Sequence, residues 1–207
     1  MSAQEVNDFF EKYVYGFILA DIKREIAFAK SGCKIQSDNR SYSGGGNYLC
    51  ALGLLCYTEF MGGIYLGTFK ESSRILFDTF FHLMGPDYEA FDKQLSKKPS
   101  MRDPRKKLSA YEVFRCGMVH EYFIKKSGVI SMLSGNVHQQ LTIEGDEFTL
   151  QPIGVSTYKG LAQQGIGILD DGRYFFVVEQ YYKDFAETCR KVHNTILNSP
   201  NPSIPES

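Results

Sequence analysis

The segment Asn47–Phe69 reads NYLCALGLLCYTEFMGGIYLGTF and carries a single charge, Glu59. Its length is close to what a helix needs to cross a bilayer. A lone carboxylate in the middle of such a span is costly, however, and four glycines and two cysteines keep the hydrophobicity modest. We therefore predict a buried helix of a helical bundle, broken near Gly62-Gly63, and expect no membrane association. A membrane-spanning helix is the alternative.

Amphipathic helices are predicted on both sides of this segment. Upstream, apolar residues recur at every fourth position over about residues 5–30, which is typical of a helix with one buried face. That stripe comprises Phe10, Val14, Ile18, Ile22 and Ile26, with Phe17 beside it. Downstream, a helix over about 70–84 is predicted to bury Ile75, Leu76, Phe80 and Leu83. Asp87 is predicted to cap a short helix that ends near residue 95.

The chain changes character after Gly128. Short apolar runs at 129–133, 137–143 and 148–153 predict strands. Two more, at 166–169 and 173–178, flank Asp170-Asp171-Gly172, a sequence typical of a hairpin turn. Further helices are predicted over about 108–126 and 179–197, the second burying Tyr182, Phe185, Val192 and Ile196.

The predicted fold is mainly α (α+β), a helical bundle with a small antiparallel β appendage before the last helix. We divide it into the bundle (1–128), antiparallel β hairpins (129–178), a C-terminal helix that packs back on the bundle (179–197) and a disordered tail rich in Pro and Ser (198–207).

The five cysteines are odd in number and form no Cys-x-x-Cys pair, which favours free thiols in a reducing compartment. The N-terminal residues lack the basic and apolar regions of a secretory signal. We therefore expect a cytoplasmic protein. The net charge of −1 excludes a globally basic nucleic-acid binder.

The segment 111–123, YEVFRCGMVHEYF, contains the pattern Arg-x4-His-x-Tyr, formed by Arg115, His120 and Tyr122. This pattern resembles the signature of HEPN domains, the helical-bundle family of many prokaryotic toxin and defence ribonucleases. The resemblance covers the predicted bundle in architecture and these few residues in motif. It implies an endoribonuclease of toxin–antitoxin or defence type whose active site is completed across a two-fold homodimer. Cys116 departs from the family, which often has Asn, Asp or His after the Arg.

The three motif residues suit RNA cleavage without metal or cofactor. His titrates near neutrality and can act as acid or base, so His120 is the candidate for proton transfer to and from the 2′-hydroxyl chemistry. Arg115 can hold two phosphate oxygens and stabilise the transition state, and Tyr122 supplies a positioning hydroxyl. No His, Cys or carboxylate cluster has the spacing of metal ligands. On one regular helix, Arg115 and His120 point roughly 140° apart, so two facing copies are expected to complete the site.

A basic window surrounds this motif. Residues 97–126 carry a net charge of +6, while the rest of the chain carries −7. Its flanking cations are candidate RNA phosphate ligands: Lys97, Lys98, Arg102, Arg105, Lys106, Lys107, Lys125 and Lys126. Glu59 is the candidate orienting residue, paired with Arg115 or holding His120 in one tautomer. A solvated basic loop is the alternative for the window.

Two readings of the whole chain therefore remain. The first is a metal-independent endoribonuclease that cleaves by 2′-hydroxyl transesterification. The second is a non-catalytic nucleotide- or RNA-binding, or protein-interaction, module on the same helical fold. The β appendage is open to three roles: it reads substrate, binds a protein regulator or extends the dimer.

Overall fold

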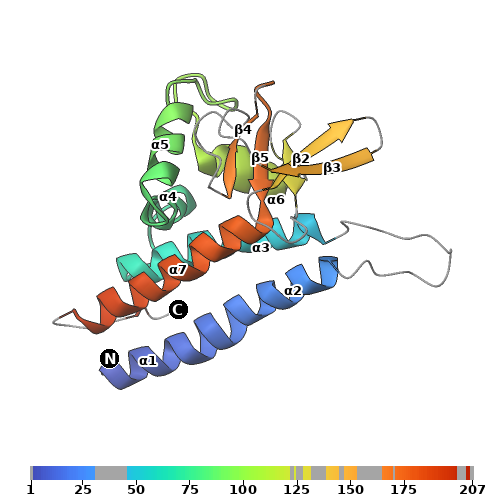
Figure 1. The fold of residues 1–207 in the computed structure, drawn as a ribbon. Coiled ribbons are helices and arrows are strands. Elements are labelled where there is room, and N and C mark those ends of the chain that lie inside the picture. Colours follow the sequence, from blue (N-terminus) through green and yellow to red (C-terminus); the bar gives the residue numbers. More distant parts are fainter. Residues whose placement is uncertain are drawn as a thin grey trace.

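The computed structural model describes residues 2–30, 46–121, 124, 128–131, 139–144, 147–152, 165–169, 171–199 and 204–205. Helices make up most of this part of the chain, and a small three-stranded sheet precedes the last helix. The predicted fold class is therefore confirmed (Figure 1).

The N-terminal helix runs through three segments: α1 (Ala3–Phe9), a π-helical stretch η1 (Phe10–Leu19) and α2 (Ala20–Lys30). Ser2 and Glu5 form a capping box at its start, which satisfies free N–H groups of the first turn. The predicted apolar stripe from Phe10 to Ile26 is buried, as expected. Phe17 is 58% exposed and does not share that face.

Helix α3 (Asn47–Leu66) passes through Gly62 and Gly63 without a break, so the predicted interruption is wrong. The two glycines instead allow close contact with the segment that follows. A Cβ on Gly62 would lie 1.8 Å from the carbonyl oxygen of Leu76, and one on Gly63 would lie 2.2 Å from the ring of Phe69. The helix ends at Gly67, whose φ of 70° is the left-handed conformation that favours glycine.

Within the described residues, α3 is the one helix long and apolar enough to cross a membrane, and half of its most apolar stretch is buried inside the protein. Helix α4 (Ser73–Leu83) packs against it. Leu76 and Phe80 are buried as predicted, but Ile75 is 47% exposed. The buried face is completed by Phe77 and Phe81, because α4 is rotated so that Leu76 faces Gly62.

Helix α5 (Pro86–Leu95) begins two residues earlier than predicted. Gly85 occupies the N-cap position with φ of 147°, and Pro86 starts the helix, where a missing N–H costs nothing. Asp87 therefore lies in the first turn and is not the cap. The predicted helix at 108–126 corresponds to η2 (Tyr111–Cys116), a π-helical turn, and α6 (Gly117–Glu121).

The sheet has the order β1-β5-β4, formed by β1 (Val129–Ser131), β4 (Ile166–Ile168) and β5 (Tyr174–Val177). The β4–β5 pair is antiparallel, and Gly172 adopts a φ of 86° in its turn, as the Asp-Asp-Gly sequence predicts. The β1–β5 pair is parallel, so the sheet is mixed. Strands β2 (Gln139–Glu144) and β3 (Glu147–Pro152) form a separate antiparallel hairpin.

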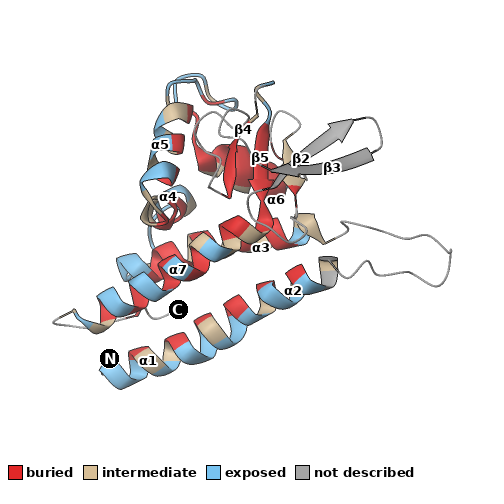
Figure 2. Cartoon of the chain, in the orientation of Figure 1, coloured by how far each residue is buried: buried red, intermediate tan, exposed pale blue. Residues whose placement is uncertain are grey.

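Helix α7 (Val178–Leu197) follows β5 directly and lies beside both α3 and the N-terminal helix (Figure 1). Its apolar face is buried (Figure 2), including Phe185, Val192 and Ile196 as predicted, whereas Tyr182 is half-buried. Ile204 is also buried, which differs from the disordered tail predicted for 198–207. Residues 200–203 and 206–207 lie outside the described part.

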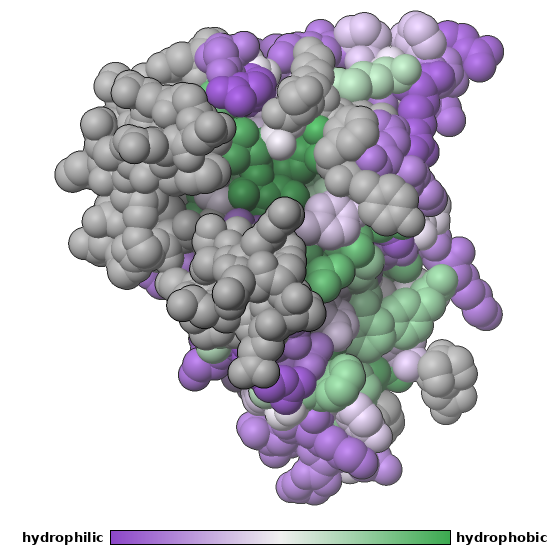
Figure 3. Space-filling view, turned by 90° about the vertical axis from the view of Figure 1, so that its right-hand side faces the viewer, coloured by the Kyte–Doolittle hydropathy of each residue, from purple (hydrophilic) through white to green (hydrophobic). Residues whose placement is uncertain are grey.

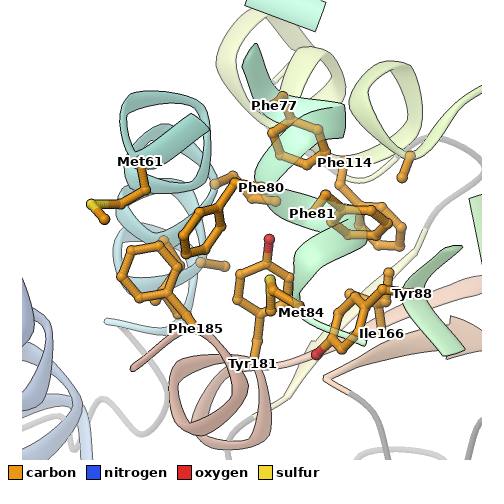
Figure 4. Close-up of a cluster of buried hydrophobic side chains, with 14 of the residues drawn as sticks. Met61, Phe77, Phe80, Phe81, Met84, Tyr88, Phe114, Ile166, Tyr181 and Phe185 are labelled. Carbon is orange, nitrogen blue, oxygen red and sulfur yellow. The ribbon is translucent and has the colours of Figure 1, made fainter. Parts of the chain in front are cut away.

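The core at the centre of the fold is rich in aromatic rings (Figure 4). Phe80 and Phe185 lie 5.2 Å apart between ring centroids, and Phe81 meets Tyr88 edge-on at 5.1 Å. Tyr181 satisfies its buried hydroxyl with Thr58 at 2.8 Å. Tyr88 donates to Asp184 at 2.6 Å and accepts from the N–H of Gly165. These bonds join α3, α5 and the sheet to α7, because each buried hydroxyl needs a partner.

Gly62→Ala is predicted to destabilise the protein, because its methyl group would force α4 away from α3. Overpacking of this kind costs about 1–3 kcal/mol, which exceeds the gain in helix propensity. Urea unfolding of Gly62→Ala should therefore show a lower midpoint than the wild type. The matched control is Gly53→Ala in the same helix, where the nearest atom is the flexible end of Ile22 and no loss is expected. Equal stability of both variants would contradict the close packing.

Candidate functional site

Two carboxylates, one half-buried and one buried, accept hydrogen bonds from backbone groups at the start of the motif segment. Asp92 of α5 accepts a hydrogen bond from the N–H of Ala110 at 2.8 Å. Glu112, 8% exposed, accepts one from the N–H of Met101 at 2.8 Å. These two hydrogen bonds attach the N-terminal end of η2 to α5 and to the basic loop (residues 97–107). They fix the position of the motif segment at its start.

Arg115 and Glu59 form an ion pair between η2 and α3. The Nε atom of Arg115 lies 2.8 Å from Oε2 of Glu59, and the two side chains are 18% and 17% exposed. The two atoms make no aligned hydrogen bond. Among the described residues, the guanidinium donates no hydrogen bond at all. Glu59 therefore holds the charge of Arg115 electrostatically, and within the described residues the N–H donors of Arg115 are uncommitted.

The side chains around this pair are aromatic or sulfur-containing. The guanidinium carbon of Arg115 lies 5.8 Å from the ring centroid of Tyr111, within cation–π range. Burial raises the pKa of Tyr111, with a smaller contribution from Cys116, while Arg115 opposes the shift. Burial also raises the pKa of Cys56, and Arg115 again opposes it. The Tyr111 hydroxyl and the Cys56 thiol therefore stay protonated at neutral pH. Arg115 is thus a cation next to neutral, partly buried side chains.

His120 lies in α6 and is exposed to solvent, whereas Arg115 faces α3. Among the described residues, His120 makes no hydrogen bond or ion pair. Glu59 is thus placed against Arg115, the first of the two predicted orientations. Tyr122 lies outside the described residues. The structure therefore joins Arg115 with Glu59, and it leaves His120 on the surface, as the divergence of the two positions on one helix predicted.

The basic loop between α5 and η2 is folded by its own hydrogen bonds. The hydroxyl of Ser100 accepts from the N–H groups of Arg102 and Asp103, and Leu108 donates to the carbonyl of Lys98 at 2.9 Å. Six of the predicted cations project from this loop and are exposed: Lys97, Lys98, Arg102, Arg105, Lys106 and Lys107.

Two of these six cations have acidic partners. Arg105 pairs with Asp103 at 3.0 Å, and Arg102 lies 3.9 Å from Glu121 of α6. In the part of the chain that the structure describes, the four lysines form no ion pair. The loop therefore presents a fixed, partly neutralised basic surface connected to α6 through Arg102. Lys125 and Lys126 lie outside the described residues.

A second polar site, which the sequence did not predict, lies between the N-terminal helix and α7. A groove of about 660 Å³ runs along the seam of these helices. Its lining residues are Glu11, Tyr15, Leu19, Ala20, Lys23, Tyr182, Arg190, His193 and Asn194. The residues at 11, 15, 19 and 23 recur every fourth position, a periodicity visible in the sequence next to the apolar stripe. Nothing in the sequence indicated that His193 lies opposite them.

The described residues contain no cluster of three or more potential metal ligands among His, Cys, Asp and Glu. Four cysteines in this part of the chain are free thiols: Cys50, Cys56, Cys116 and Cys189. No known protein family, curated protein or solved structure matches this chain. The chemistry of the site must therefore be argued from its own residues.

Breaking one side of the Glu59–Arg115 pair should destabilise the fold more than removing both charges. Glu59→Gln and Arg115→Gln are each expected to lower the free energy of unfolding, because each leaves a partly buried charge unpaired. In the double variant the loss should be smaller than the sum, with a coupling of about 1–2 kcal/mol. The exposed Glu89–Lys93 pair, 2.6 Å apart, is the control and should show much weaker coupling. Additive effects at Glu59 and Arg115 would contradict the pairing.

Asp78 predicts a pH dependence of stability. Burial, reinforced by Asp92 of the neighbouring helix, raises the pKa of Asp78 to about 6, although Arg74 lies 3.3 Å away. A carboxyl whose pKa is raised in the folded state stabilises the fold when protonated, and that stability is lost as pH rises from about 4 to 6. Asp78→Asn should therefore exceed the wild type in stability at pH 7.5, by roughly 2 kcal/mol, and lose that advantage near pH 4.

Denaturant unfolding from pH 4 to 8 measures this difference. Asp103→Asn is the control of opposite sign, since hydrogen bonds from Arg105 lower the pKa of Asp103. Its carboxylate adds stability above its ordinary pKa, so the amide should weaken the protein at neutral pH. A pH-independent effect at Asp78 would show that its carboxyl is not protonated by the fold.

Proposed function

We propose that this protein is a metal-independent endoribonuclease of HEPN-like type that acts as a homodimer. The observation that carries the proposal is the state of Arg115. Its charge is held by Glu59 in a partly desolvated position, yet its N–H donors are uncommitted among the described residues. A guanidinium in this state is suited to hold a phosphate, whose two oxygens match its planar fork. The exposed imidazole of His120 lies five residues further along the same segment.

In the proposed reaction, His120 accepts the proton of a ribose 2′-hydroxyl. The 2′-oxygen forms a bond to the adjacent phosphorus, and the bond from phosphorus to the 5′-oxygen of the next nucleotide breaks. The departing 5′-oxygen takes a proton from an imidazolium, so the products are a 2′,3′-cyclic phosphate and a 5′-hydroxyl. Arg115 neutralises the charge that gathers on the phosphoryl oxygens, and Tyr122 positions the strand.

The dimer is part of the proposal because Arg115 and His120 diverge within one chain. Arg115 faces α3 and His120 faces solvent, so a two-fold axis next to α6 is needed to bring Arg115 of one copy toward His120 of the other. Figure 3 shows apolar surface on this face of the protein, with polar residues along its right-hand edge, and exposed apolar surface suits contact with another protein. The exposed lysines of the basic loop then extend the site with phosphate contacts.

A non-catalytic RNA-binding module is the second candidate, and a specific observation favours it. Glu59 neutralises Arg115 at 2.8 Å, and a thiol, Cys116, takes the place where the family often has a polar side chain. Both features weaken transition-state stabilisation without removing the basic loop. In this candidate the basic loop binds RNA, and the β appendage engages a protein regulator. In either candidate the free thiols suit a reducing cytoplasm.

The decisive test incubates the protein with mixed single-stranded RNA in excess EDTA. We expect cleavage to products with 2′,3′-cyclic phosphate ends, and a loss of at least about 100-fold in His120→Ala and Arg115→Ala. The double variant Glu59→Gln/Arg115→Gln separates lost chemistry from lost folding, since it leaves no unpaired charge. Arg24→Ala is a matched control away from the motif and should keep activity. Folded wild-type protein that binds RNA without cutting it would decide for the binding module.

Mixing two inactive variants tests the shared site. In a mixed dimer of Arg115→Ala and His120→Ala chains, one of the two composite sites contains both wild-type residues. Since half of the randomly mixed dimers are heterodimers, about a quarter of wild-type activity should return. A site within one chain would give no recovery, and this outcome would contradict the dimeric arrangement.

A further inference from the structure

The groove between the N-terminal helix and α7 has the features of a small-molecule site. Its volume of about 660 Å³ falls within the range of roughly 300–1,000 Å³ that ligand pockets occupy. One wall comes from η1 and α2, and the other comes from α7. In Figure 1 these two helices run along one side of the molecule, away from the motif segment in η2 and α6.

His193, which is buried, and Tyr15, which is half-buried, form a polar pair in the groove. His193 is 6% exposed, and its Nδ1 lies 2.8 Å from the hydroxyl of Tyr15. Its ring stacks on Phe10 with centroids 4.2 Å apart, which fixes the ring orientation. Burial lowers the pKa of His193 and raises that of Tyr15 to about 12. Both groups are therefore neutral at pH 7, and the floor is polar and uncharged.

The charges of the groove lie at its edge. Lys23 and Arg190 lie on opposite walls, and among the described residues neither forms an ion pair. Their sequence neighbours behave differently, because Arg24 pairs with Asp21 and Lys191 pairs with Glu187. Lys12 and Lys183 also form no ion pair among the described residues, so what distinguishes Lys23 and Arg190 is that both line the same groove.

Arg190 also lies near the two tyrosines of the groove, Tyr15 and Tyr182. Its positive charge lowers the pKa of both Tyr15 and Tyr182, against the effect of burial on each. Tyr182 is fixed by its hydroxyl, which donates to the carbonyl of Leu19 at 3.1 Å. The single acid, Glu11, leaves the groove with a net positive charge. The groove therefore combines two cationic side chains with two tyrosine rings.

The π-helical segment η1 contributes to this wall. Glu11, Tyr15 and Leu19 all belong to it, and widened turns of this kind occur frequently at functional sites. Gly16 is suited to the widened turn, since a Cβ there would lie 2.9 Å from the carbonyl oxygen of Glu11. The unusual backbone of the N-terminal helix thus coincides with the groove.

We propose that this groove binds a small organic anion, in which a carboxylate or phosphate group is attached to a flat apolar ring. Lys23 and Arg190 bind the oxyanion. The ring packs against Tyr15 and Tyr182, and Asn194 offers an amide to polar substituents. This site is separate from the Arg115 motif and does not depend on the proposed ribonuclease activity.

The test measures binding of simple probes to the full-length protein by ligand-observed NMR and calorimetry. Benzoate and phenyl phosphate represent the two sources of the anion, and the tighter one identifies the group. Phenol and inorganic phosphate each carry half of the recognition and should bind at least about fivefold more weakly. Arg190→Gln and Lys23→Gln should each weaken the better probe severalfold.

Matched controls keep the same change in net charge. Lys191→Gln and Arg24→Gln replace the paired neighbours and should leave binding unchanged. Tyr15→Leu removes one of the two rings that pack against the ligand and should reduce binding while the fold remains intact by circular dichroism. Binding of phenol or inorganic phosphate as tight as that of the aromatic anions would overturn the proposal. So would absent binding of both anions, or equal affinity in Arg190→Gln, Lys23→Gln and the controls.

Discussion

The burial of helix α3 constrains the rest of the structure. This helix is apolar on most of its surface and carries one charge, so it must be covered on several sides while Glu59 finds a partner. Helices α2, α4 and α7 cover it, and Gly62 lets α4 approach to backbone distance. Arg115 pairs with Glu59, the one charged residue of α3. The motif segment therefore lies against α3 because Glu59, a partly buried carboxylate, needs a cationic partner.

This constraint also explains why Arg115 and His120 have different environments. Arg115 faces α3 because its ion-pair partner Glu59 lies on that helix, and the following turn carries His120 to the surface. Arg115 forms an ion pair that joins two helices, whereas His120, five residues further on, makes no hydrogen bond or ion pair among the described residues. The proposed ribonuclease therefore depends on a second copy of the chain, which brings its own His120 toward Arg115.

Within the described residues, the basic loop and the groove at the N-terminal helix are two separate parts of the surface that carry cations. The basic loop is organised by Ser100 and Glu112, so its lysines project from a defined backbone. The groove at the N-terminal helix is smaller, and it combines two cations with tyrosine rings and a neutral imidazole. A loop of spaced charges suits an extended polyanion, whereas a groove with rings suits a compact anion. The two regions therefore differ in ligand size as well as in position.

The sequence by itself determined the helical class, the stripe from Phe10 to Ile26 and the turn at Gly172, because periodicity and glycine conformation are local properties. It also indicated that Glu59 would either pair with Arg115 or orient His120, and the structure places it against Arg115. Only the tertiary structure decided that Gly62 is a contact point rather than a break, that Phe77 replaces Ile75 in the core, and that β1 pairs in parallel with β5. The groove at His193 belongs to this second group. Each of these features depends on residues far apart in the chain, whose approach is set by packing and leaves no local pattern.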